Sequence, residues 1–459
     1  MLDSPKILST NFIKYITLLF LHLLLWSATV STLWGIYRLE LYGIIYISIL
    51  IFNVFLSQKN KLSQLFGLSS FIYFYQVPFV LLFPITKEIE YRYEFSGSDL
   101  FEYLLLYNVV LICLCLINVI ISKIDFKTII YRIEKDKSLN IITNIALAFS
   151  VLLMIHTFLS IGGLHSYLSL NKFEASEAQS LGYFSFKDFA SLYILLGAIS
   201  SKTRKQLIIY FSFCSLFLFF EMISAKRFLI LVFVVAMFLF KFREIKVRHF
   251  FYGLCSLFVM SFLKFTYYNI RLFVKGDDTF LSIFWFDWSD LFLDTVFLGE
   301  SRAHMILTAN YITKHITFQP EMFLNQIIVS FPFGHRIVPN FQTASSYLMT
   351  HLNVDWVGLA SSQYITPYLS LGLFGVFICY SLHSVIISFL SYAALHLKNL
   401  FFAYLLIAIS PILFFYAHRE ELVLVIKSMI VQSVAIFILF CTAYIIMQIT
   451  TNLIYKRRV

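Results

Sequence analysis

The chain has 459 residues, of which 60% are hydrophobic, 19% aromatic and only 13% charged. A soluble domain of this length could not solvate so apolar a surface, so the composition indicates a polytopic integral membrane protein. The formal net charge of +10 does not indicate a nucleic-acid partner, because the basic residues form short clusters between apolar runs, as the positive-inside rule describes.

Apolar runs long enough for a helix to cross a bilayer recur along the whole chain. They predict an all-α fold of about twelve transmembrane helices in a single domain, residues 1–459. The first run lacks a cleavage signal and is expected to be an uncleaved span. The runs begin near Phe12, Leu39, Leu62, Leu100, Leu139, Asp188, Leu207, Phe228, Phe250, Gln363, Leu400 and Leu422.

The charges between these runs alternate, and this alternation predicts the orientation. The basic group is expected in the cytoplasm, together with both termini. It comprises Lys59 and Lys61, the cluster 123–137, the cluster 202–205, the cluster 241–248, Lys398 and the cluster 456–458. The acidic or mixed group is expected outside, in the periplasm of a bacterial inner membrane. It comprises residues 88–99, Glu174 and Glu177, the long stretch 269–362, and Glu420 with Glu421.

Residues 269–362, which we call the outer segment, form a long, partly helical periplasmic loop in this prediction. Asp287, Asp290 and Asp294 share one helical face, which predicts a helix lying on the membrane surface. A solvated face explains these aspartates as well as a cation site does, and we expect no metal. Residues 331–342 contain two prolines and a glycine and are predicted to be an irregular loop.

Sequence motifs for cofactors are missing. The six cysteines lie in apolar runs without a CxxC pair, so neither a disulfide framework nor a zinc site is expected. The chain has no GxxxxGK[ST] and no GxGxxG motif. We therefore expect no nucleotide-driven chemistry and no cofactor.

Cations on the outer side are the first candidates for a binding site, because ionisable residues at the ends of spans are costly. Arginine offers phosphate oxygens a planar fork of donors, so several converging guanidinium groups predict an anionic substrate. Scattered surface pairs with nearby acids are the alternative. The candidates are Lys226 and Arg227 at a tight outer turn, together with Arg271, Arg302, Arg336 and Arg419.

Candidates for acid–base chemistry lie in the same outward regions. Glu300, Arg302 and His304 fall within about one helical turn, and His335 precedes Arg336 in the irregular loop. A neighbouring arginine keeps a carboxylate ionised. For each histidine taken singly, a structural role remains the alternative. The full set is Glu300, His304, His335, Asp355, His418 and Glu420.

Three local patterns, together with the topology, resemble the Wzy-type O-antigen or oligosaccharide repeat-unit polymerases. One is the small-residue-then-arginine turn at residues 224–227, where Ala225-Lys226 replaces the usual glycine before Arg227. The others are the proline-containing loop from Phe331 to Pro339 and the start of the next span, where Tyr364 precedes Gly372-x-x-Gly375. The topological resemblance covers most of the chain.

The resemblance implies a GT-C-like membrane glycosyltransferase that uses undecaprenyl-diphosphate-linked oligosaccharides. The growing glycan would pass from its lipid diphosphate to a new lipid-linked unit. Arg227, Arg336 and Arg419 would hold the diphosphate, assisted by Arg271 or Arg302, with Lys226, His304 and Tyr364 also facing the substrate. Glu300 or His335 would deprotonate the acceptor hydroxyl. Implied partners are membrane lipids, a chain-length regulator and a flippase.

The outward location supports the same chemistry without the resemblance. A periplasmic site has no ATP and no nucleotide sugar, so its donor must be activated before it crosses the membrane. A lipid diphosphate is such a donor, and arginines can stabilise the departing charge without a metal. An O-antigen ligase and a lipid-oligosaccharide flippase or other transporter remain the alternatives.

Overall fold

The computed structural model describes most of the chain. The described elements are almost entirely helices, which confirms the all-α expectation. The described residues are 38–56, 60–74, 77, 97–163, 166, 180–181, 184–223, 228–241, 262, 266, 302–344, 346–347 and 362–456.

The first part of the chain supplies eight α-helices to the described structure, and the last of them continues as a π-helix. A pair of two-residue antiparallel strands, β1 (Ser180–Leu181) and β2 (Phe184–Ser185), precedes α10. The helices are α2 (Arg38–Leu56), α3 (Lys61–Phe74), α5 (Gly97–Ile121), α6 (Phe126–Glu134), α7 (Leu139–Ile161), α10 (Phe186–Ser200), α11 (Arg204–Ile223) and α12 (Phe228–Ala236), which continues as η2 (Met237–Lys241).

The second part of the described chain contains three short helices of the outer segment and three long apolar ones. The short helices are α15 (Arg302–Thr313), α16 (Glu321–Ser330) and α17 (Gly334–Ile337). The others are α19 (Ile365–His396), α20 (Phe401–Phe414) with the 3-10 turn η5 (Tyr416–His418), and α21 (Leu422–Lys456).

Helices begin within three residues of ten of the predicted starts, and most of the runs from Phe12 and Phe250 lie outside the described residues. Among the described helices, five are long and apolar enough to cross a membrane. Twelve spans and a GT-C-like architecture stay predictions. The five are Phe101–Ile121, Leu139–Ile161, Ile365–His396, Phe401–His418 and Leu422–Thr450.

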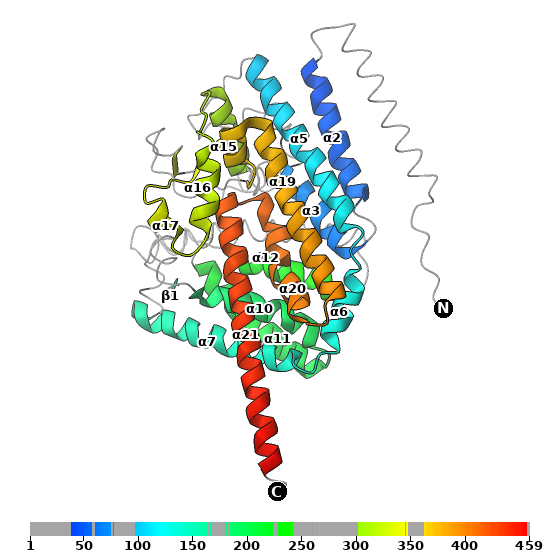
Figure 1. The fold of residues 1–459 in the computed structure, drawn as a ribbon, viewed down its shortest axis with the longest axis vertical. Coiled ribbons are helices and arrows are strands. Elements are labelled where there is room, and N and C mark those ends of the chain that lie inside the picture. The colour runs from blue at the N-terminus through cyan, green and yellow to red at the C-terminus, as the bar shows by residue number, and fades with distance from the viewer. Residues whose placement is uncertain are drawn as a thin grey trace, which may run out of the picture.

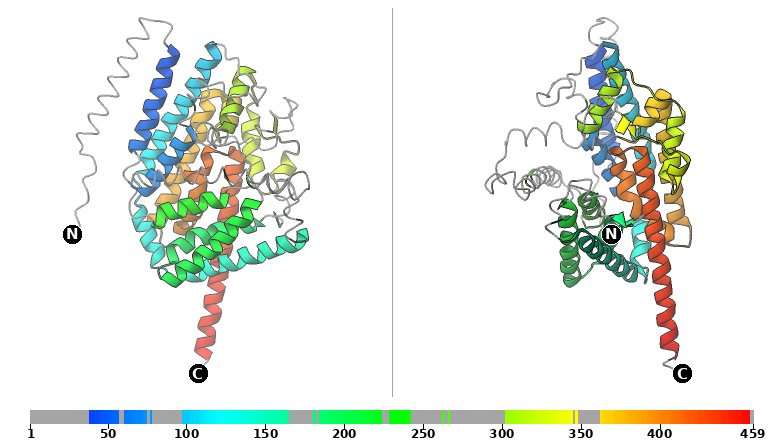
Figure 2. Two further views of the ribbon diagram at one scale, coloured as in Figure 1. Left: turned by 180° about the vertical axis from the view of Figure 1, so that it is seen from behind. Right: turned by 90° about the vertical axis from the view of Figure 1, so that its left-hand side faces the viewer.

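The long helices pack in a continuous series, α2 on α5, α5 on α19, α19 on α20, and α20 on α21 (Figure 1). Helix α10 packs on α7, α11 and α12, and this group crosses the long helices in Figure 1 and in the left-hand view of Figure 2. Helix α21 has 35 residues, or about 52 Å, and its C-terminal half extends beyond the other helices. This length exceeds a hydrocarbon core of about 30 Å.

Helix α20 contains a proline, and a neighbouring side chain replaces the backbone hydrogen bond that this proline cannot make. Pro411 cannot donate to the carbonyl of Ile407, four residues earlier. The Ser410 hydroxyl donates to that carbonyl instead, at 2.8 Å. The last carbonyls of the helix accept from other elements: Ser69 of α3 donates to Phe414 at 2.7 Å. The protein interior therefore supplies partners for part of this helix end.

Helix α19 is broken at Gly372, where φ is 61° and ψ is −151°, a conformation open almost only to glycine. A Cβ on Gly375 would lie 2.0 Å from the carbonyl oxygen of Pro367, so the two halves of the helix also require glycine for close approach. The break frees carbonyls, and Leu369 accepts from the backbone of Phe318 at 2.9 Å. The Gly372-x-x-Gly375 pattern thus marks a kink in α19, and a backbone hydrogen bond from the outer segment caps the carbonyl of Leu369 beside it.

The basic loops described by the structure meet at one end of the bundle. Lys61 donates to the Leu239 carbonyl at 2.9 Å, and Lys241 donates to the Ser201 carbonyl at 2.8 Å. Arg132 of α6 donates to carbonyls at the C-terminal end of α19. This convergence agrees with the predicted grouping of basic loops on one side. Which side is cytoplasmic stays a prediction.

Candidate functional site

The junction between α20 and α21 consists of His418, Arg419, Glu420 and Glu421. Its charges suit the ends of the two helices, since a cation follows the C-terminus of α20 and carboxylates precede the N-terminus of α21. The junction lies well below the upper ends of α2 and α5 in two perpendicular views (Figures 1 and 2). It is therefore recessed in the bundle.

His418 is fully buried and surrounded by aromatic rings. Its imidazole lies 5.1 Å from the ring of Phe66 and 5.8 Å from that of Phe74, centroid to centroid. Its backbone carbonyl accepts from the Ser362 hydroxyl. For His418 the structural alternative to acid–base chemistry describes this environment better, because the ring anchors the junction to α3.

Arg419 is the candidate phosphate ligand that the structure describes in most detail. Its side chain is 23% exposed, and its Nε lies 3.9 Å from Oε1 of Glu420. Burial acts to lower the pKa of the guanidinium, but Tyr73, Glu420, Tyr416 and Glu221 together hold that pKa above its ordinary value. Arg419 is thus a permanent cation that borders solvent while most of its surface is covered.

Glu421 joins the junction to the outer segment. This carboxylate is 2% exposed, and Oε2 accepts from Nε2 of Gln326 at 3.3 Å and from the backbone N–H of Ala344 at 3.1 Å. Ser330 of α16 donates to the carbonyl of Val423 at 3.2 Å. Residues nearly one hundred positions apart therefore meet here, so the described part of the outer segment packs against the junction.

The ends of α11 and α12 also reach the junction. Glu221 is fully buried and accepts from the backbone N–H of Leu229 at 2.6 Å, while its charge acts on Arg419. The ring of Phe228 lies 5.4 Å from that of Tyr416. Glu221 and Phe228 lie on either side of residues 224–227 in the sequence. Lys226 and Arg227 themselves are outside the described residues.

His335 and Arg336 lie on α17, and both are exposed. The guanidinium of Arg336 lies over the ring of Phe333, 5.1 Å from its centroid, and no described contact joins either residue to Arg419. Gly334 fixes this turn closely on α16, because a Cβ there would lie 2.0 Å from the Ile328 carbonyl oxygen. Residues 331–342 are irregular as predicted, apart from this single helical turn.

Arg302 and His304 both belong to the first turn of α15, but the structure describes only their backbone. Glu300, Arg271 and Asp355 lie outside the described residues, as do the predicted surface helix and its three aspartates.

Tyr364, predicted to face the substrate, is fully buried. Its ring lies 5.9 Å from that of Tyr107 and 6.4 Å from that of Phe74. Burial, followed by the influence of Tyr107, raises the pKa of its phenol well above the ordinary value. This is the environment of a packing residue, so contact with substrate would require the aromatic cluster to open.

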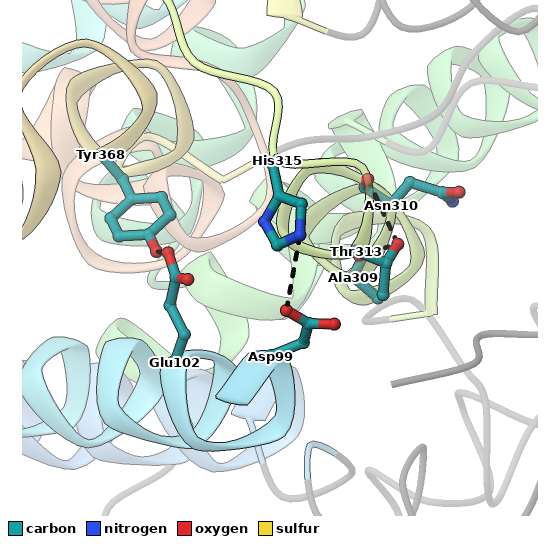
Figure 3. Close-up of polar contacts among 7 residues, drawn as sticks. All are labelled: Asp99, Glu102, Ala309, Asn310, Thr313, His315 and Tyr368. Carbon is teal, nitrogen blue, oxygen red and sulfur yellow. Dashed lines mark hydrogen bonds and ion pairs between the residues drawn. The ribbon is translucent and has the colours of Figure 1, made fainter. Parts of the chain in front are cut away.

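A second polar region, which the sequence did not indicate, lies where α5 begins (Figure 3). Asp99 is buried, and its Oδ1 lies 4.0 Å from Nε2 of the exposed His315. Tyr368 donates to the carboxylate of Glu102. The i, i+3 spacing of Asp99 and Glu102 on the first two turns of α5 was the available signal, but nothing in the sequence indicated their partners.

His315 holds an unusual backbone conformation for its residue type. It ends α15 with φ at 50°, while the N–H of Ile316 donates to the carbonyl of Tyr311 at 2.9 Å. Glycine is the usual residue at this position of a helix end. A histidine there costs about 1–2 kcal/mol. This backbone conformation places the imidazole of His315, a residue of the outer segment, beside Asp99 of α5.

The described part of the chain contains no group of three or more side chains able to hold a metal ion. A comparison of the chain with protein-family models, with curated proteins and with solved structures found no significant match. The geometry of the junction and the sequence patterns are therefore the basis for proposing a function.

Proposed function

We propose that the protein is a polymerase of surface polysaccharide repeat units, in the manner of an O-antigen polymerase. It would transfer the growing glycan from undecaprenyl diphosphate to a new lipid-linked unit on the periplasmic side of the inner membrane. The observation that carries the proposal is the junction: a recessed arginine beside the outer segment in an apolar helical protein.

The proposed transfer requires the site to hold the diphosphate while its bond to the sugar breaks. A guanidinium can donate two parallel hydrogen bonds to phosphate oxygens and stabilise the charge that develops on the leaving group. Arg419 is already covered on most sides, so its interaction with an anion would be screened less than at an open surface.

Arg419 alone does not make the junction cationic. Glu221 and Glu420 both act on this one guanidinium, and the buried Glu421 adds a third carboxylate to the junction. A diphosphate clamp therefore needs further cations. Lys226 and Arg227 are candidates because they lie in the sequence between Glu221 and Phe228, which both reach the junction. Arg271, Arg302 and Arg336 of the outer segment would add to them, and Glu300 or His335 would take the proton of the acceptor hydroxyl.

The test is a lipopolysaccharide gel of a deletion strain that expresses variants from a plasmid. We expect Arg419→Ala and Arg227→Ala to shorten or abolish the polymer ladder while leaving one repeat attached and protein levels unchanged. Arg419→Lys keeps the charge but loses the fork of donors, so it should give an intermediate ladder. Arg204→Ala, an exposed arginine at the opposite, basic end, is the matched control and should give a full ladder.

The deletion strain separates the alternatives. A ligase would leave unattached polymer, and a flippase would leave the lipid-linked units on the cytoplasmic face with no repeat attached. Full-length ladders from both Arg419→Ala and Arg227→Ala would refute the diphosphate clamp.

A further inference from the structure

A cavity of about 280 Å³ lies at the end of the bundle that gathers the basic loops. It is separate from the junction, because Lys61 borders the cavity while Tyr73 of the same helix α3 acts on Arg419. Twelve residues of helix separate these two positions, or about 18 Å. The cavity is therefore a second candidate site.

Three lysines and one carboxylate line this cavity: Lys61, Lys202, Lys241 and Glu134. Three ammonium groups against one carboxylate leave a net charge of about +2 within a small volume. Lys127 of α6 acts electrostatically on Lys61 and adds to the positive field, whereas Glu134 acts on Lys241 and opposes it. The net positive charge of the cavity favours binding of an anion and disfavours binding of a metal cation.

Hydrogen bonds to backbone carbonyls fix the positions of two of these ammonium groups. Lys61 donates to the carbonyl of Leu239 in η2, and Lys241 donates to the carbonyl of Ser201 at the end of α10. Both carbonyls lie at the C-terminal ends of helices, where the helix dipole favours a cation. An ammonium group carries three donors, so the bond from Lys241 to Ser201 leaves that amine able to donate to a ligand.

The size and position of the cavity narrow the ligand class. Its volume is close to the lower limit of small-molecule sites, roughly 300 Å³, which suits a phosphate-bearing headgroup rather than a dinucleotide. Apolar walls from Ile130, Ile199 and Phe240 adjoin the lysines. The cavity lies where α3 begins and where α10 and η2 end, at the end of the bundle that loop charge predicts to face the cytoplasm.

We propose that this cavity binds a phosphate-bearing anion, supplied by the headgroup of an anionic phospholipid. Basic pockets between membrane helices on the cytoplasmic side are a known means of holding such headgroups. The site is independent of the proposed polymerase chemistry, because it uses no residue of the junction.

The experiment measures the thermal stability of the purified full-length protein in detergent. One arm titrates phosphatidylglycerol against phosphatidylethanolamine, and the other titrates inorganic phosphate against chloride at equal ionic strength. We expect phosphatidylglycerol to stabilise the wild-type protein more than phosphatidylethanolamine does. Lys202→Gln and Lys241→Gln should each weaken that binding roughly fivefold, and Lys202→Arg should retain it.

Lys205→Gln is the matched control, since Lys205 is exposed at the same end but does not line the cavity. Lys202→Gln keeps the test decisive if Lys241→Gln fails to fold, because the Lys202 ammonium makes no described hydrogen bond. A stabilisation by inorganic phosphate that these variants lose would retain the anion site but assign it to a soluble phosphate. Equal responses of wild type, Lys202→Gln and Lys205→Gln in both arms would overturn the proposal.

Discussion

Glu421 is the residue whose environment departs furthest from its sequence context. In the sequence it is one of two adjacent glutamates between apolar runs, where an exposed pair of charges would be ordinary. In the structure its carboxylate is buried and accepts from Gln326 and from the backbone of Ala344. A buried carboxylate needs such donors, so the contact fixes the position of the outer segment against the junction.

We predict that Glu421→Ala destabilises the protein by about 1–3 kcal/mol, because it leaves two buried donors without their acceptor. Glu421→Gln keeps one acceptor oxygen and should cost less. The measurement is thermal unfolding in detergent. Glu321→Ala, an exposed glutamate at the start of α16, is the control and should change little. Equal losses from Glu421→Ala and Glu321→Ala would contradict the structural link.

At the scale of elements, the sequence predicted the positions of most helices because apolar run length is a strong local signal. It also predicted that residues 331–342 would be largely irregular, since Pro332, Gly334 and Pro339 disfavour a long helix. Contacts between residues that are far apart in the sequence had no such local signal. The Asp99–His315 pair and the buried position of Tyr364 depend on which helices pack together, and that choice is not local.

The break in α19 is an element-scale feature that a single substitution can test. Gly372→Ala should cost about 1–3 kcal/mol, because φ at 61° with ψ at −151° is closed to alanine. A Cβ at this position would meet nothing within 4 Å, so the cost would come from the backbone and not from a clash. Thermal unfolding measures the loss.

The control for that substitution is Ser384→Ala in the regular part of the same helix, whose hydroxyl only bonds the carbonyl of Tyr380. A stability of Gly372→Ala equal to that of Ser384→Ala would mean that α19 is continuous. A continuous α19 would also remove the reason for Leu369 to accept from Phe318, and with it one attachment of the outer segment.

At the scale of the whole molecule, the proposed function requires the junction to face the periplasmic side of the membrane. The structure groups Lys61, Lys202 and Lys241 around one cavity, which agrees with the alternation of loop charge in the sequence. Loop charge does set orientation in membrane proteins. The same alternation could not predict that α7, α10 and α11 cross the long helices. Loop charge indicates the side of the membrane on which a loop lies, but not which helices pack together.

We predict that both termini and the basic end face the cytoplasm while His315 and Glu321 face the periplasm. Single cysteines at His315 and Glu321, both exposed, should react with a membrane-impermeant maleimide in spheroplasts. Cysteines at Lys202 and Lys398, also exposed, should react only after permeabilisation. The background must lack the native cysteines, since Cys441 is exposed. The opposite labelling pattern would place Arg419 on the cytoplasmic side, where nucleotide sugars are present, and would remove the reason for a lipid-diphosphate donor.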